Sequence, residues 1–184
     1  MQWTNLANIP PRSYTCGHCG NRVGAHTGWH VNTEPPENVS IHICPLCSKP
    51  SLFLFAKQYP GVSPGSAVSN LPTDVASLYD EARSALSAGA ATAAVLACRK
   101  LLMNIAVTQG AATGLSFVAY VEYLATAGYI PPNGRGWVNH IRKRGNEATH
   151  EIALMSVSDA VELITFSEML LKFIYEFPAR VPAA

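Results

Sequence analysis

The chain has 184 residues and a formal net charge of +1 at pH 7, with 48% hydrophobic and only 14% charged residues. A charge this small excludes a basic surface over the whole molecule, the kind that binds nucleic acid without regard to sequence. No unbroken run of about 18 apolar residues, the length that crosses a bilayer, occurs in the sequence, so we expect a cytoplasmic protein that does not enter membranes.

Four cysteines in two close pairs dominate the first sixty residues: Cys16 with Cys19, and Cys44 with Cys47. Two thiolates separated by two residues can bind one ion from a single turn, and two such turns complete the tetrahedral shell that zinc prefers. The spacing therefore predicts a zinc ribbon over residues 1–57. Because four protein ligands leave no position for water, the zinc would be structural.

The neighbouring residues agree with a metal knuckle, since Gly17 and Gly20 permit positive φ values and Pro45 presets a turn. Two disulfides are the rival interpretation and need an oxidising compartment, but residues 1–11 lack the apolar core of a secretory leader. A thioredoxin-type redox site would need only one pair, beside a βαβ pattern. Because the cysteines already satisfy the ion, we interpret four histidines as surface residues: His18, His26, His30 and His42.

Strands are expected at Val39–Ile43, where apolar residues alternate, and at Leu52–Phe55, on either side of the second cysteine pair. Few residues between Trp3 and Phe55 could build a core, so this part should depend on its metal. Residues 58–73 are rich in proline, glycine and serine and are interpreted as a linker.

Residues 74–184 carry apolar residues at helical spacing, with capping residues and glycine stops between the runs. Cys98 lies among apolar neighbours and is interpreted as a buried small hydrophobic residue. The predicted helices run from Asp74 to a stop at Gly89, from Ala90 to about Gln109, from Leu115 to Ala127, from Gly136 to about Arg144, and from a capping box at Ser156 and Asp159 to at least Glu176.

The last of these helices is apolar around most of its circumference, with only a narrow polar stripe. Such a helix should contact more than one bundle core. Either a second copy of the chain covers its spare face, which makes a homodimer, or the ribbon does.

One stretch concentrates charge in a chain that is otherwise poor in it. On an unbroken helix Asn146 and His150 would share a face, whereas Arg144 and His150 would lie about 120° apart. An ordinary helix boundary also explains the pattern, with basic residues ending one helix and Glu147 beginning the next. The residues concerned are Arg142, Lys143, Arg144, Asn146, Glu147 and His150.

The stretch Arg144–His150, which reads Arg-Gly-Asn-Glu-Ala-Thr-His, resembles the Arg-x(4 to 6)-His signature of the HEPN superfamily. The prokaryotic branch with an amino-terminal zinc ribbon is the most similar. The likeness extends to Leu71–Val75, to Tyr79–Ala82 and to Ala93–Leu102, which look like the opening helices of that branch.

This resemblance implies a dimeric all-α bundle with metal-independent endoribonuclease activity in a defence or toxin system, including defence against phage. Arg144 and His150 would take the signature positions, and Asn146 and Glu147 would join them at the site. Many members keep a glutamate near the end of the second helix, where this chain has Met103 and Asn104. Further phosphate contacts would come from Arg142, Lys143, Arg135 and His140.

Taken together, the sequence predicts a mainly α protein: a HEPN-like bundle of four to five helices over residues 74–184, preceded by a small β zinc ribbon. The leading functional prediction is RNA cleavage by a dimer. The alternatives are a non-catalytic adaptor that binds nucleic acid or protein, and the regulatory half of a defence pair. The four ribbon cations, Arg12, Arg22, Lys49 and Lys57, favour protein contact over strong DNA binding by the ribbon.

Overall fold

The computed structural model describes residues 3–31, 39–131, 134, 136–138 and 154–181. The chain divides into two compact units. The first, called the ribbon unit, comprises Met1–Ser63 with Ser87–Gly89, and the second, called the helical unit, comprises Pro64–Leu86 with Ala90–Ala184. Each unit contains a hydrophobic core of its own.

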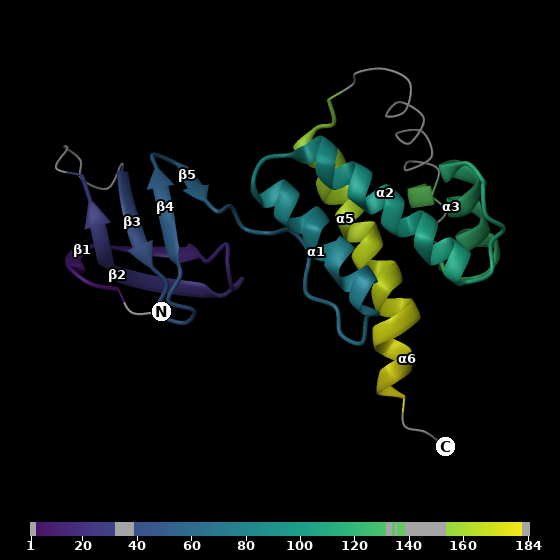
Figure 1. Ribbon diagram of the computed structural model, residues 1–184, viewed down its shortest axis with the longest axis horizontal. Helices are drawn as coiled ribbons and strands as arrows, with labels where there is room; N and C mark the ends of the chain where they lie inside the picture. Colours follow the sequence, from purple (N-terminus) through teal and green to yellow (C-terminus); the bar gives the residue numbers. More distant parts are fainter. Residues whose placement is uncertain (1–2, 32–38, 132–133, 135, 139–153, 182–184) are drawn as a thin grey trace. The chain divides into compact units, whose positions relative to one another are not determined.

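The ribbon unit is a five-stranded antiparallel sheet in which strands that follow one another in sequence are neighbours (Figure 1). One face of this sheet carries a small core of Tyr14, Val23, Ala25 and Phe53 together with the cysteines. The strands are β1 (Ala7–Thr15), β2 (Arg22–His30), β3 (Val39–Ile43), β4 (Pro50–Leu54) and β5 (Lys57–Tyr59).

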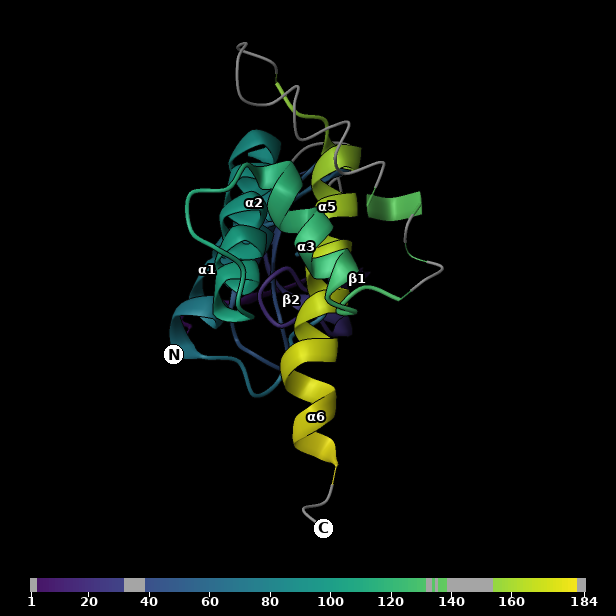
Figure 2. The same ribbon diagram turned by 90° about the vertical axis from the view of Figure 1, so that its right-hand side faces the viewer.

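In the helical unit, α2 lies at the centre of the core and packs against α3 and α5 (Figure 1). The last three helical segments, α5, η3 and α6, follow one another as a single rod (Figure 2). The segments are α1 (Thr73–Ser87), α2 (Ala91–Thr108), α3 (Phe117–Thr126), α5 (Val157–Leu171), the π-helical turn η3 (Lys172–Glu176) and α6 (Phe177–Arg180).

The helix boundaries confirm the sequence prediction to within two residues for α1, α2 and α3. The predicted stop Gly89 adopts positive φ, and so do Gly110 and Gly128, the glycines that directly follow the predicted ends of the next two helices. The capping box at the start of α5 is also present, since Ser156 accepts a hydrogen bond from the Asp159 amide and Asp159 accepts one from the Ser156 amide. Of the helix predicted from Gly136 to Arg144, only residues 136–138 lie in the described part of the chain, and they are helical.

The predicted fold class, a mainly α bundle, is wrong. Among the described residues 46% are helical and 20% are in strands, which makes the protein a mixed α/β fold. The error lies in the ribbon, where the sequence indicated strands only around the second cysteine pair. β1 and β2, nine residues each, were missed.

Helix α2 is, among the described residues, the one helix that bears on the expectation about membranes. Its 18 residues have a mean hydropathy of 1.4, so by length and composition alone it could cross a bilayer. In the structure its apolar side chains instead form the centre of the helical core, and Cys98, Leu101 and Ile105 are fully buried there. The position of Cys98 confirms that it is a buried small hydrophobic residue.

Residues 64–70, called the strap, belong to the predicted linker but are held on the helical unit by side chains. Arg83 donates to the carbonyl oxygens of Pro64 and Gly65, at 2.9 and 3.0 Å. The amides of Ser66 and Ser69 donate to the carboxylates of Glu168 and Glu176, at 3.0 and 2.9 Å. The strap is therefore bonded to α1, to α5 and to the π turn.

Candidate metal centre

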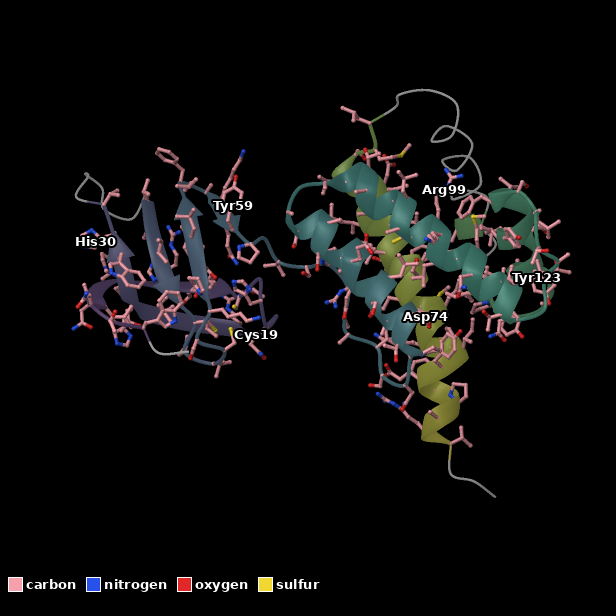
Figure 3. The ribbon with its side chains drawn as sticks, viewed as in Figure 1. Cys19, His30, Tyr59, Asp74, Arg99 and Tyr123 are labelled. Carbon is pink, nitrogen blue, oxygen red and sulfur yellow. The ribbon has the colours of Figure 1, made fainter. Side chains whose placement is uncertain are left out.

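The four cysteines lie in two turns that each connect a pair of strands. The first knuckle, residues 16–20, follows the end of β1 and leads into β2. The second, residues 44–48, follows the end of β3 and leads into β4. Figure 3 labels Cys19 in the first knuckle. Because β1 to β4 are consecutive in one sheet, the two turns are brought to a common site.

The two knuckles share one hydrogen-bond pattern. In each, the residue after the second cysteine donates its amide to the carbonyl of the first: Gly20 to Cys16 at 2.8 Å, and Ser48 to Cys44 at 2.9 Å. The amide of each first cysteine in turn donates to the residue five positions on, at 2.9 and 3.0 Å. The repetition means that both pairs present their sulfurs from the same local geometry.

One residue in these turns, Gly17, differs from the sequence prediction. Gly20 adopts φ +71°, as expected, and the equivalent position in the second knuckle is Ser48 at φ +56°. Gly17 is not among the residues with positive φ, so that part of the prediction is wrong. Gly17 is needed for space instead, because a Cβ there would lie 2.3 Å from the carbonyl oxygen of Pro60.

The sulfur atoms of all four cysteines lie within 4.8 Å of one another, which is close enough to bind one metal ion. The nearest contacts join the two knuckles, with Sγ–Sγ distances of 3.8 Å between Cys16 and Cys47 and 3.9 Å between Cys19 and Cys44. Neither distance is that of a disulfide, whose sulfurs lie about 2.05 Å apart. All four cysteines are free thiols here.

The electrostatic surroundings differ within each pair, because the first cysteine is fully buried and the second is partly exposed. Burial raises the pKa of the Cys16 thiol above its ordinary value. At Cys19 the backbone amide of Asn21 outweighs burial and lowers the pKa of the thiol to about 7. Buried thiolates are costly without a cation, so a metal ion is the natural counter-charge for this cluster.

The histidines of the ribbon unit take no part in the described metal cluster. His18, His26 and His30 are exposed, as predicted. His42 is 2% exposed, which contradicts the prediction that it lies on the surface. Its ring bonds to the carbonyl of Ala25 and to the hydroxyl of Ser40, so it is a core histidine whose polar atoms are satisfied.

The other predicted site residues lie outside the described part of the chain. Arg135 is flanked by the described residues Gly134 and Gly136. For the other predicted residues the nearest described ones are Val138, which is buried in the helical core, and Leu154, which is 86% exposed. The predictions for this segment stay predictions: Arg144, His150, Asn146 and Glu147 as catalytic residues, and Arg142, Lys143, Arg135 and His140 as phosphate contacts.

The helical unit shows two polar features that the sequence did not single out. Arg99 on α2 is 9% exposed, its guanidinium lies 4.6 Å from the centre of the Phe117 ring, and burial lowers its pKa (Figure 3). A groove of about 350 Å³ also lies between α1 and α2, with Val75 and Leu101 among its apolar residues and Asp74, Glu81 and Lys100 among its charged ones. The sequence offered one signal for the buried Arg99, which is that an arginine stands in an otherwise apolar helix.

These observations define a class of protein, a four-cysteine ribbon joined to a separate helical unit. Residues 80–183 match the family described as a domain of unknown function, DUF4145, and because the match covers more than half of the chain, the protein belongs to that family. No curated protein and no solved structure matches the chain.

Proposed function

We propose that the four-cysteine cluster binds one structural zinc ion. The Sγ–Sγ distances carry this proposal. A zinc ion bound to thiolates at about 2.3 Å in a tetrahedron separates neighbouring sulfurs by about 3.8 Å, and the shortest distances here are 3.8 and 3.9 Å. With all four positions taken by cysteine, the ion has no site for water or substrate, so it serves folding rather than chemistry.

The test is the zinc content of the purified protein. We expect one zinc per chain in the parent and a loss of zinc in Cys47→Ser. Cys98→Ala is the matched control, because this cysteine lies in the helical core and should leave the zinc content unchanged. A parent protein that contains another metal, or none, would overturn the proposal.

The proposed activity of the whole protein is metal-independent RNA cleavage by a HEPN-type homodimer. The support is the Arg144–His150 signature, which falls inside the family match at residues 80–183. Because the proposed zinc site has no free coordination position, side chains would have to perform the catalysis. RNA supplies its own nucleophile in the ribose 2′-hydroxyl. The cytoplasm is the compartment we propose, because free thiols persist in reducing surroundings.

In the proposed reaction, the imidazole of His150 transfers protons near neutral pH and the guanidinium of Arg144 neutralises the phosphate. Cleavage needs both an acid and a base, and a two-fold dimer would supply a second His150. Asn146 and Glu147 would orient these groups.

Labelled RNA incubated with the protein and EDTA tests this activity. We expect cleavage by the parent and a loss of about a hundredfold or more in His150→Ala and in Arg144→Ala. The control is His26→Ala, an exposed histidine of β2. If His150→Ala cleaves RNA as fast as the parent, the proposal of HEPN-type cleavage is wrong.

A second candidate function is a binding module without catalysis. It is favoured by exposed apolar side chains on the ribbon unit, among them Leu46 at 65% and Phe55 at 69%. Binding of RNA that weakens with salt, without turnover, would support the nucleic-acid form of this function. Capture of a defined protein segment would support the protein form.

A further inference from the structure

The face of the ribbon sheet that points away from its core is apolar. Residues directly opposite each other on neighbouring antiparallel strands share a face. By this rule Trp29, Ile41, Leu52 and Tyr59 form one row across β2, β3, β4 and β5. Beside it runs a second row of Val39, Leu54 and Lys57. We call these two rows the outer face.

The outer face stays accessible to solvent. Tyr59 is 44% exposed and Leu54 is 37% exposed, and Trp29, Val39, Ile41 and Leu52 are partly exposed. An antiparallel sheet with one face in water ordinarily carries polar residues on that face. A contiguous apolar face instead marks a surface that binds a partner.

The tip of the β4–β5 hairpin adds an independent observation. Leu54 pairs with Lys57, so Phe55 and Ala56 form a two-residue turn. Phe55 adopts φ +55°, a conformation that costs a residue with a bulky side chain about 1–2 kcal/mol and normally selects Gly or Asn. Its side chain is 69% exposed, so burial within the chain does not offset this cost. A strained, exposed aromatic residue is expected where the ring contacts a partner.

Charge and side-chain type indicate the chemistry of that partner. Residues 1–63 contain four Lys or Arg and two Glu, Glu34 and Glu37, which gives a net charge of +2, and the exposed Lys57 lies on the outer face itself. A partner segment that carries Asp or Glu would therefore meet a net positive charge. Four of the seven side chains in the rows are aliphatic, namely Val39, Ile41, Leu52 and Leu54, and of the two aromatic ones Trp29 packs edge-on against Trp3. Aliphatic side chains pack on other side chains but offer no ring on which a base can stack, so most of this surface suits apolar side chains better than bases.

We propose that the outer face and the tip residue Phe55 form a docking surface for a protein segment that combines large apolar residues with Asp or Glu. The ring of Phe55 is the anchor, and Lys57 pairs with an acidic residue of the segment. This surface requires a folded ribbon unit but does not depend on RNA cleavage. Figure 3 labels Tyr59, which lies in the same hairpin.

The experiment selects short random peptides against the full-length, zinc-loaded chain and then measures the affinity of the selected peptides. We expect the selected peptides to be rich in Asp or Glu next to Leu, Ile or Phe. Phe55→Asn should weaken their binding roughly tenfold or more while leaving stability equal or higher, because Asn tolerates the positive φ. Val62→Asn is the matched control, since Val62 is also exposed, at 47%, but lies outside the sheet, and it should bind like the parent.

A charge reversal sharpens the test, because Lys57→Glu should shift the selection towards basic peptides. The zinc content of every variant distinguishes a lost docking surface from a lost ribbon. The inference is overturned if Phe55→Asn binds like the parent, or if the parent selects basic peptides or none. It is also overturned if the same variant abolishes binding of single-stranded RNA or self-association of the chain, rather than peptide binding.

Discussion

Gly28 in β2 shows how strictly one position can be restricted to glycine by its neighbours. A Cβ at this residue would lie 1.8 Å from the carbonyl oxygen of Ile41 on β3. Real atoms cannot approach so closely, so any larger residue must push the two strands apart. In the same strand, Gly24 has no atom within 4 Å of its would-be Cβ.

We therefore expect Gly28→Ala to lower the free energy of unfolding of the ribbon unit by about 1–3 kcal/mol or more. Gly24→Ala is the control and should change it by about 0.5 kcal/mol or less, because that position has room. Chemical denaturation followed by tryptophan fluorescence measures both. Equal stability of the two variants would contradict the steric argument.

Single residues of the metal centre were only partly predictable. The cysteine spacing gave the ligand set, because two residues between thiols is a local requirement. The packing of Gly17 on Pro60 and the burial of His42 depend on strands that are distant in sequence, so no local pattern indicates them. Residues of one type can thus have opposite environments, as His42 and the exposed His26 show.

At the scale of elements, the start of α5 depends on its capping box. Ser156 accepts a hydrogen bond from the Asp159 amide, which satisfies a backbone donor that the helix itself cannot. We expect Ser156→Ala to lower the unfolding free energy by about 1 kcal/mol. Ser158→Ala, in the first turn of the same helix but not at the cap, should have a smaller effect. Thermal unfolding of the two variants beside the parent makes the comparison.

The π turn η3 explains how two carboxylates of one helix hold the strap. Glu168 and Glu176 are eight residues apart, and on a regular α-helix they would differ in direction by about 80°. A π turn holds an extra residue and so reduces this rotation. Both side chains can then bond to the strap, at Ser66 and Ser69.

This arrangement predicts a dependence of stability on pH. Burial favours protonation of Glu168, but its hydrogen bonds with Lys172 and Ser66 outweigh burial and hold its pKa below the ordinary value of 4.5. The stabilisation is therefore complete above pH 4.5 and is lost as the pH falls through the lowered pKa. We expect the difference in thermal stability between the parent and Glu168→Gln to shrink as the pH is lowered below 4.5.

Glu81→Gln, which removes an exposed carboxylate of α1, is the control for the loss of a carboxylate. It should change the thermal stability little, because exposed surface substitutions usually have small effects. The difference in thermal stability between the parent and Glu168→Gln could instead stay constant as the pH is lowered. That result would mean that the hydrogen bonds to the strap do not depend on the charge of the carboxylate.

The helices were easier to predict than the strands, for a physical reason. A helix is specified by residues three and four apart and by its own caps, which the sequence around Gly89, Gly110 and Ser156 displays. Strands β1 and β2 pair with an irregular register between Asn8 and Arg12. Pro10 and Pro11 in β1 and the glycines of β2 also break the alternation that indicates a strand.

At the scale of the whole molecule, the two units should respond differently to loss of metal. The ribbon unit has a small core built around its cysteines, whereas the helical unit has a large core of its own. We expect a strong chelator to abolish the ribbon's tryptophan signal and β-sheet circular dichroism while the helical signal persists. Zinc, but not magnesium, should restore the sheet. Helical and sheet signals that disappear together would contradict this independence.

Phe55 has one more consequence, for laboratory evolution. A population of variants selected only for survival of heating should accumulate Gly or Asn at position 55, because the backbone there suits those residues. Parallel selection for retention of the docking partner should keep an aromatic ring. If the two selections yield different residues at position 55, the requirement for folding of the ribbon unit is distinguished from the requirement for binding another molecule.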